Sequence, residues 1–419
     1  MEGATATFVK ETLPGGMRVV VEPIPHVRSV AVGLWYGVGS RHEDETTSGL
    51  SHFLEHMFFK GTARRSARDI AETMDQVGGQ LNAVTTKEYT CIYTRVLDEH
   101  FPIGLDVIAD MALNSRLDPQ DVEREKGIIL EEIKLYEDTP DEQIHDFLVQ
   151  TMWDGHALGR SVLGTAEAVQ AFDVAEVARF FDTYYRPANM VVGVAGNVDP
   201  PVVVNSVAAA FDGRQGGARP SEGGAPTRAV RREVRRKDTE QVHLAVGGTG
   251  VPLEHPDMYG LQLVSMILGG GPSSRLFQEI REERGLAYSV YSYTASYRDG
   301  GLSAIYAGVS PRHAASVLEL VQAELLALSS GGIKEMELQR ARDQVKAAMV
   351  MSLESTSSRM SRLARGELML GRVLDTDEII ARIDAVTLDD AHRIADALLG
   401  PNELTVCAIG PVHPDLAPI

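Results

Sequence analysis

The segment AFDVAEVARFFDTYYRPANMVVGVAG, residues 171–196, has a counterpart near the end of the chain. AVTLDDAHRIADALLGPNELTVCAIG, residues 385–410, aligns with it without a gap, and the shared residues include Pro187 and Pro401. Each copy reads as an amphipathic helix, a turn that contains the proline, and an apolar strand rich in β-branched residues. Three consecutive elements in the same register predict that the chain contains an internal duplication.

A stretch rich in Gly, Pro and Ser, residues 213–228, divides the chain near its midpoint and reads as a linker. We therefore expect one domain over residues 1–212 and a homologous domain over residues 229–419. A second correspondence pairs GLSHFLEHMFF, which starts at Gly49, with GLQLVSMILGG, which starts at Gly260. Both follow an apolar strand, although two unrelated α/β segments can look alike at this level.

Helices and strands alternate along both halves. Residues 17–24, 29–38 and 81–97 read as strands, and residues 66–77 read as a helix with Ser66 as its N-cap. The predicted class is α+β, with two similar domains that each consist of a mostly antiparallel sheet backed by helices.

The composition of the 419 residues excludes several classes of protein. A net charge of −19 disfavours nucleic acid and anionic membranes as partners. Two cysteines, Cys91 and Cys407, are too few for a disulfide framework or a cysteine zinc site. We find neither a signal peptide nor a run of 18 apolar residues, so we expect a cytoplasmic protein without a membrane partner.

The residues with the clearest chemistry are His52, Glu55 and His56 in the sequence HFLEH. On a helix, the two histidines lie one turn apart and can bind one metal ion, while Glu55 can reach a water molecule on that ion. The alternative is a helix with two ordinary surface histidines. The neighbours are mostly Leu, Phe and Met, which indicates a buried helix whose polar groups need partners.

A third protein ligand is expected from a helix that begins near Asp118 and Pro119. Glu125 and Glu132 are seven residues apart on it and therefore share a face. Glu132 has apolar residues at helical neighbour spacings, which would make its carboxylate costly unless it is paired or bound to metal. An interior salt bridge explains Glu132 equally well at this point. The flanking residues are Ile128, Ile129, Leu135 and Tyr136.

The sequence HFLEHMFFKGT, followed by a helix with two glutamates seven apart, resembles the pitrilysin-type inverzincin metallopeptidases. The similar branch is that of the mitochondrial processing peptidase and its bacterial relatives. In that family the third ligand follows the second histidine by 76 residues, as Glu132 follows His56. The resemblance implies one zinc ion per chain held by His52, His56 and Glu132, with Glu55 as general base and Glu125 as the residue that orients the site.

The resemblance also implies substrate contacts. Asn82 and Ala83 match a sheet-edge strand to which the substrate adds as a further strand, although an ordinary internal strand also explains this stretch. ILGGGPSSRLFQEIREERGLAYSVYS, residues 267–292, resembles the C-terminal signature of the family. There, Arg281 and Tyr288 would bind the substrate and the developing oxyanion. The other reading of this stretch is a Gly-rich turn before a charged helix.

The predicted function is that of a zinc-dependent endopeptidase acting on peptides, unfolded segments or presequence-like segments inside a chamber. The resemblance implies a homodimer, or a heterodimer with a related chain. The second half carries Leu263, Met266 and Ile267 where the first has His52, Glu55 and His56, so it would hold no metal. The alternatives are a noncatalytic scaffold, like a respiratory-complex core protein, and a catalytic subunit that needs a partner chain.

Overall fold

The computed structural model describes residues 8–214, 216–217, 219–221, 223–400 and 404–412. Pro401 of the repeat and three residues of the expected linker, 215, 218 and 222, lie outside these ranges. The chain forms two compact units that are each built from three separate segments. The first unit comprises Met1–Ile133, Ser161–Gly223 and Val350–Asp375, and the second comprises Lys134–Arg160, Gly224–Met349 and Thr376–Ile419. Each compact unit contains segments from both sides of residues 213–228. The expected boundary between homologous halves at these residues therefore stays a prediction.

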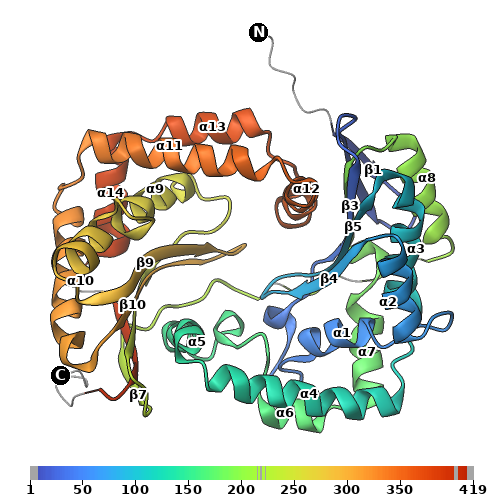
Figure 1. Cartoon of the computed structure of the whole chain (residues 1–419), viewed down its shortest axis with the longest axis horizontal. Helices are drawn as coiled ribbons and strands as arrows, with labels where there is room; N and C mark the ends of the chain where they lie inside the picture. Colours follow the sequence, from blue (N-terminus) through green and yellow to red (C-terminus); the bar gives the residue numbers. More distant parts are fainter. Residues whose placement is uncertain (1–7, 215, 218, 222, 401–403, 413–419) are drawn as a thin grey trace. The chain divides into compact units, whose positions relative to one another are not determined.

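The first unit contains a six-stranded sheet in the order β1-β2-β6-β3-β5-β4 (Figure 1). Its neighbouring strands are antiparallel except for β2 and β6, which run parallel. The strands are β1 (Val9–Thr12), β2 (Arg18–Pro23), β3 (Ser29–Tyr36), β4 (Gln80–Thr85), β5 (Thr90–Leu97) and β6 (Met190–Gly196).

Apolar side chains on one face of this sheet form a core with the surrounding helices, and the metal-site helix α1 is part of that core. The other face packs against α12 (Thr356–Leu370), which comes from the C-terminal half of the chain (Figure 1). The remaining helices of this unit are α1 (Leu50–Phe58), α2 (Ala67–Gln76), α3 (Phe101–Asn114), α4 (Pro119–Glu137, shared with the second unit from Lys134), α6 (Ala166–Ala171), α7 (Val174–Tyr184) and α8 (Pro200–Ala210).

The second unit contains a five-stranded sheet in the order β7-β11-β8-β10-β9, in which only β7 and β11 pair in parallel among the described strands. Its strands are β7 (Arg232–Arg236), β8 (Val242–Thr249), β9 (Ala287–Ser296), β10 (Gly301–Val309) and β11 (Thr405–Gly410). Its helices are α5 (Pro140–Met152), α9 (Met258–Gly269), α10 (Ala314–Ser329), α11 (Glu335–Ser352, shared with the first unit from Val350), α13 (Thr376–Asp384), α14 (Leu388–Leu399) and the π-helix η5 (Phe277–Glu283). Short 3₁₀ turns cover η1 (Ser40–His42), η2 (Asp98–His100), η3 (Ala157–Gly159), η4 (Pro187–Asn189) and η6 (Pro311–His313).

The duplication and the α+β class are confirmed. The repeated segment forms α7 and β6 in the first copy and α14 and β11 in the second, and both sheets contain one parallel pair. At the positions matching the metal-site residues, Leu263 and Ile267 are buried in the core of the second unit, and Met266 packs against that core.

One helix from each half packs on the sheet of the other half. The helix α5 covers one face of the second sheet, and α12 covers one face of the first sheet. Glycines allow the close approach, because a Cβ at Gly193 would lie 2.7 Å from Cβ of Ala364, and one at Gly247 would lie 2.4 Å from Sδ of Met152. Sequence periodicity alone did not predict this exchange.

Local predictions from the sequence hold with two corrections. Ser66 caps α2 by accepting a hydrogen bond from the backbone N–H of Asp69, as expected. The stretch 81–97 is not one strand, because it turns at residues 86–89 into the hairpin of β4 and β5. On α4, Ile128 and Leu135 are exposed rather than buried beside Glu132, so the apolar-side argument for Glu132 was wrong. The buried apolar residues of α4 are Val122, Ile129 and Ile133.

Cys91 and Cys407 are both buried free thiols, which agrees with the absence of a disulfide framework expected from the sequence. Within the described ranges, none of the helices combines the length and the apolar composition that crossing a bilayer requires.

Candidate metal centre

The helix α1 holds both histidines and is fixed at its N-terminus. The carboxylate of Glu43 accepts hydrogen bonds from the backbone N–H groups of Gly49 and Ser51, each at 2.7 Å. These N–H groups lack partners within the helix, and the helix dipole favours a negative charge at this end. Gly49 adopts φ +94°, a left-handed conformation that glycine accepts without strain. The apolar side of α1 is buried in the core, with Leu50, Phe53, Leu54, Met57 and Phe58 as its members.

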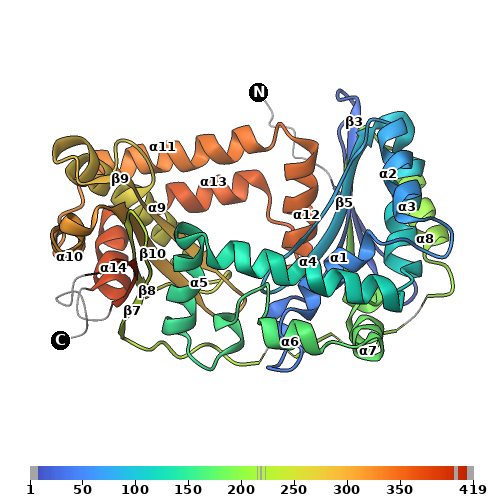
Figure 2. The same cartoon turned by 60° about the horizontal axis from the view of Figure 1, so that its bottom comes forward.

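His52, His56 and Glu132 come together although they lie on two helices. Each offers one ligand atom, and these three atoms lie within 4.8 Å of one another. Nε2 of His52 is 3.8 Å from Oε1 of Glu132, and Nε2 of His56 is 3.6 Å from Oε2 of Glu132. Two donors bound to one tetrahedral zinc ion are about 3.3 Å apart, so the donor types fit zinc and a bound ion would draw the three atoms closer together. Figure 2 shows α1 close to α4.

The ring of His56 is oriented by Glu125. Oε2 of Glu125 lies 3.2 Å from Nδ1 of His56, and Oε1 lies 2.6 Å from Nζ of Lys60. The Lys60 contact is an ion pair rather than a well-aligned hydrogen bond. Burial raises the pKa of Glu125, but the hydrogen bond with His56 and the interaction with the Lys60 ammonium outweigh this effect, and the net pKa is lowered. An ionised Glu125 accepts a hydrogen bond from the Nδ1–H of His56, which leaves Nε2 unprotonated and free to bind metal.

His52 is held mainly by packing. It is nearly buried, and its ring lies edge-on to the ring of His56 with centroids 4.8 Å apart. Burial, with repulsion from His56, lowers the pKa of His52 to about 4. Among the described residues, its Nδ1 has no hydrogen-bond partner. A neutral imidazole is the form that binds metal, so His52 is ready to act as a ligand at neutral pH.

Glu55 lies beside the three ligands without being one of the group. Burial raises the pKa of Glu55, and repulsion from the carboxylate of Glu132 raises it further. Hydrogen bonding with Thr85 and attraction by His56 lower the pKa. The net pKa is above the ordinary value for a glutamate. A carboxyl with a raised pKa next to a metal site is suited to accept and return a proton.

Asn82 and Ala83 lie on β4, which is one of the two edge strands of the first sheet, as the resemblance implied. This excludes the ordinary internal strand as an explanation. β4 packs against α1, and its last residue Thr85 interacts with Glu55. The Oδ1 of Asn82 accepts the backbone N–H of Ala83 at 2.8 Å, and Asn82 is exposed while Ala83 is largely buried. The edge strand therefore ends beside the expected general base.

Arg281 and Tyr288 lie together in the second unit. The guanidinium of Arg281 lies 5.3 Å from the ring centroid of Tyr288 and 4.7 Å from that of Phe277. Tyr288 is 78% exposed at the start of β9, so its hydroxyl is accessible. A turn at Gly285, with φ +61°, brings the end of η5 back toward β9 and allows the two residues to meet. The structure therefore brings Arg281 and Tyr288 into cation–π contact.

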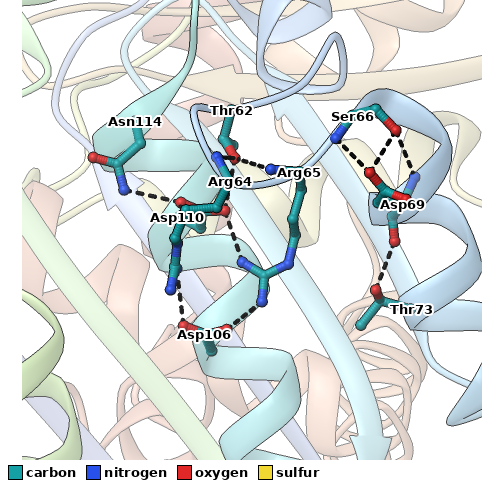
Figure 3. Close-up of polar contacts among 9 residues, drawn as sticks. All are labelled: Thr62, Arg64, Arg65, Ser66, Asp69, Thr73, Asp106, Asp110 and Asn114. Atoms are coloured by element: carbon teal, nitrogen blue, oxygen red, sulfur yellow. Dashed lines mark hydrogen bonds and ion pairs between the residues drawn. The ribbon is translucent and has the colours of Figure 1, made fainter.

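The loop after α1 is anchored by a buried aspartate (Figure 3). Both oxygens of Asp110 on α3 accept hydrogen bonds, from Thr62 at 2.7 Å, Arg64 at 3.0 Å and Arg65 at 2.7 Å. The side chain of Asp110 is completely buried. These contacts fix the segment that contains Lys60 and leads from α1 to α2.

Sequence reasoning missed Glu43, Lys60 and Asp110. Lys60 follows His56 by four residues, which is a visible helical spacing, but α1 ends at Phe58 and the contact of Lys60 is with another helix. Glu43 precedes the helix by more residues than an ordinary capping box allows, so no local signal identifies it.

Comparison with known proteins gives a consistent assignment. Residues 18–166 match the family model described as Insulinase (Peptidase family M16), and residues 171–345 match that described as Peptidase M16 inactive domain. An uncharacterised zinc protease of Bacillus subtilis is 43% identical over 387 residues, which cover 92% of this chain and 94% of that protein. An uncharacterised zinc protease of Streptomyces coelicolor is 42% identical over 419 residues, which cover 98% of this chain and 91% of that protein.

Solved structures agree in fold. A crystal structure of a protease from Helicobacter pylori has a TM-score of 0.92 at 23% identity and covers 97% of this chain and 100% of that one. At that identity the likeness supports the fold alone. The family predicted from the HFLEH motif and the paired glutamates, a family of metallopeptidase enzymes, is thus confirmed. With matching models over both halves and curated relatives above 40% identity along nearly its whole length, this chain belongs to the M16 peptidase family, that of insulinase and pitrilysin.

Proposed function

We propose that the protein is a zinc-dependent endopeptidase that binds one zinc ion per chain through His52, His56 and Glu132. The observation that carries the proposal is the convergence of two imidazole nitrogens and a carboxylate oxygen within 4.8 Å. Two histidines and one glutamate are a donor set of catalytic zinc sites, which keep a further position for water or substrate.

A zinc ion in this site supplies Lewis acidity, which lowers the pKa of water and polarises a peptide carbonyl. Glu55 takes the proton from the attacking water and later delivers a proton to the leaving amine. Its raised pKa favours the first step, because a stronger base takes the proton of the water more readily. Glu125 keeps the ring of His56 in the orientation that presents Nε2 to the metal.

The substrate is proposed to bind as an extended strand along the free edge of β4, near Asn82 and Ala83. Backbone pairing along a sheet edge recognises extended conformation more than side chains, so sequence preference should be loose. Arg281 and Tyr288 are proposed to donate hydrogen bonds to the substrate and to the developing oxyanion.

Peptides, unfolded segments and presequence-like segments are the proposed substrates. They would be cleaved inside a chamber formed when two chains pair, as a homodimer or with a related chain. The net charge of −19 favours basic peptides where the acidic groups line the chamber.

A noncatalytic scaffold of the same fold is the second candidate. Such a protein has no need for a complete set of metal ligands and a general base. The retention of His52, Glu55, His56 and Glu132 in one cluster favours the enzyme.

The test combines zinc content with peptide cleavage. The purified protein, separated by size-exclusion chromatography, is assayed for bound zinc and for cleavage of a quenched, basic, unstructured peptide with and without a chelator. We expect about one zinc per chain, and cleavage that stops when the chelator is added and returns when zinc is restored. Stoichiometric zinc without cleavage in any oligomeric fraction would favour the scaffold, and cleavage only after a related chain is added would indicate a partner-dependent subunit.

A further inference from the structure

The carboxylate of Glu125 carries a charge in the interior of the first unit. The residue has no exposed surface, and a carboxylate in such a place is strongly destabilising unless it is paired. Among the described residues, His56 hydrogen-bonds to one oxygen of the carboxylate, and Lys60 forms an ion pair with the other. His56 is a neutral donor when it serves as a metal ligand, so Lys60 supplies the positive charge.

Hydrogen bonds of its backbone hold Lys60 in place. Its N–H donates to the carbonyl of Met57 at 3.1 Å, and its carbonyl accepts from Nη2 of Arg116 at 3.4 Å. Two residues further on, Thr62 is bonded to the buried Asp110 (Figure 3). The Lys60 side chain is 29% exposed, so its ammonium reaches inward from an anchored turn.

We propose that Lys60 is a positioning residue of the zinc site, which holds Glu125 against Nδ1 of His56 and thereby fixes the ring whose Nε2 binds the metal. This inference rests on the proposed zinc site and adds a residue that touches neither metal nor substrate. Without the ammonium, the carboxylate of Glu125 loses one of its two anchors. It can then rotate away from His56 or bind the metal itself.

The experiment measures zinc affinity by competition with a chromophoric chelator, in the absence of any peptide. Lys60→Met keeps the length of the side chain and removes the charge. We expect its zinc dissociation constant to be about 10- to 100-fold weaker, the range for loss of a group that orients a ligand. Lys60→Arg keeps the charge and should recover binding to within a few-fold of the wild type.

The matched control is Lys126→Met. Lys126 follows Glu125 in sequence, and its side chain is more buried than that of Lys60. Its ammonium, however, lies 2.7 Å from Oε1 of Glu123 and forms its ion pair there. Its loss should leave zinc affinity unchanged. The absorption spectrum of the cobalt-substituted protein should change in Lys60→Met and not in Lys126→Met, because it reports ligand geometry rather than general stability.

A double variant separates positioning from general stability. In a Glu125→Gln background, Lys60→Met should weaken zinc binding less than about two-fold, because the negative charge with which Lys60 pairs has already been removed. Where Lys60→Met does not fold, Lys60→Gln takes its place with the same expected direction. Unchanged affinity in the folded charge-removing variant, an equal loss in Lys126→Met, or a full additional loss in the Glu125→Gln background would overturn the inference. A wild-type protein that binds no zinc would instead overturn the proposed function.

Discussion

Oε2 of Glu125 lies 3.2 Å from Nδ1 of His56, although 69 positions separate the two residues. This contact ties α4 to α1 at the point where Glu132, two turns further along α4, meets the histidine pair. The candidate zinc site is thus formed by two helices of one unit, each of which is fixed independently. The N-terminus of α1 is capped by Glu43, and α4 is packed into the core through Val122, Ile129 and Ile133.

Replacing Glu55 by Gln should abolish proton transfer and leave the metal in place. The amide has nearly the same size but cannot accept the proton of the attacking water. General acid–base catalysis contributes about 10²–10⁴-fold, so kcat should fall by at least that range. The measurement is kcat for a quenched peptide together with zinc content. Normal turnover by a zinc-loaded variant would show that Glu55 is not the base.

Replacing Glu132 by Gln should weaken zinc binding strongly, because the ligand loses its charge. The neighbouring Glu131 provides the control, since Glu131→Gln changes the same charge one residue away on the exposed side of α4. Chelator competition should show a large loss of affinity for Glu132→Gln and none for Glu131→Gln. Equal affinities in the two variants would contradict the assignment of Glu132 as a ligand.

Tyr288→Phe keeps the ring that stacks on Arg281 and removes the hydroxyl. If the hydroxyl donates to the oxyanion, kcat should fall by about 10²-fold with zinc content and stability unchanged. Stability should not change because Tyr288 is largely exposed. Tyr291→Phe on the same strand is the control, since its hydroxyl lies 3.0 Å from Nε2 of His145. A drop in kcat of the same size for both variants would argue against a specific role for Tyr288.

Asp110→Asn tests the network that anchors the loop after α1. Burial raises the pKa of Asp110, but hydrogen bonds from Asn114, Thr62, Arg65 and Arg64 outweigh it, and the net pKa is lowered. A lowered pKa means that the carboxylate stabilises the fold above its unfolded pKa of about 3.9, and that this contribution is lost as the pH falls through the folded value. At pH 7 the variant should be less stable by about 1–3 kcal/mol.

The pH dependence of the free energy of unfolding shows whether Asp110 stabilises the network through its charge or through the shape of its side chain. Urea unfolding at a series of pH values should show the stability difference between wild type and Asp110→Asn narrowing below about pH 4, because Asp110 becomes protonated there in the unfolded chain while it stays ionised in the folded protein. The half-exposed Asp106 is the control, and Asp106→Asn should cost less at pH 7. A difference between wild type and Asp110→Asn that stays constant from pH 7 to pH 3 would rule out the electrostatic explanation.

Gly193→Ala tests the packing of α12 on the first sheet. Its Cβ would lie 2.7 Å from Cβ of Ala364 and 3.1 Å from the carbonyl of Met360, so the helix must shift. Overpacking of this kind costs about 1–3 kcal/mol, and the unfolding temperature should fall. Gly127→Ala on α4 has open space around its Cβ and should be neutral or stabilising by up to about 1 kcal/mol. An unchanged unfolding temperature for Gly193→Ala would mean that α12 packs less closely.

Much of the first unit could be predicted because its signals are local. The helical spacing of His52 and His56, the capping of α2 by Ser66 and the repeat of α7 and β6 in α14 and β11 are all visible as residue patterns. The place of Glu132 could not be derived in this way, because Ile128 and Leu135, which were expected to mark the buried side of α4, are exposed. Its position 76 residues after His56, together with the resemblance to a family, led to the prediction that it meets the two histidines.

Contacts between residues far apart in the sequence could not be predicted, for a physical reason. Which sheet α5 or α12 covers depends on the complementarity of surfaces such as Gly247 against Met152, and amphipathic periodicity is the same for either choice. The pairing of Lys60 with Glu125 likewise joins two helices that only the fold brings together.

The most direct test of the zinc site is an anomalous-difference map, collected at the zinc absorption edge, from crystals of the protein grown with zinc. We expect one peak per chain within bonding distance of Nε2 of His52, Nε2 of His56 and a carboxylate oxygen of Glu132. A peak that does not contact Glu132, or zinc bound only elsewhere on the chain, would contradict it.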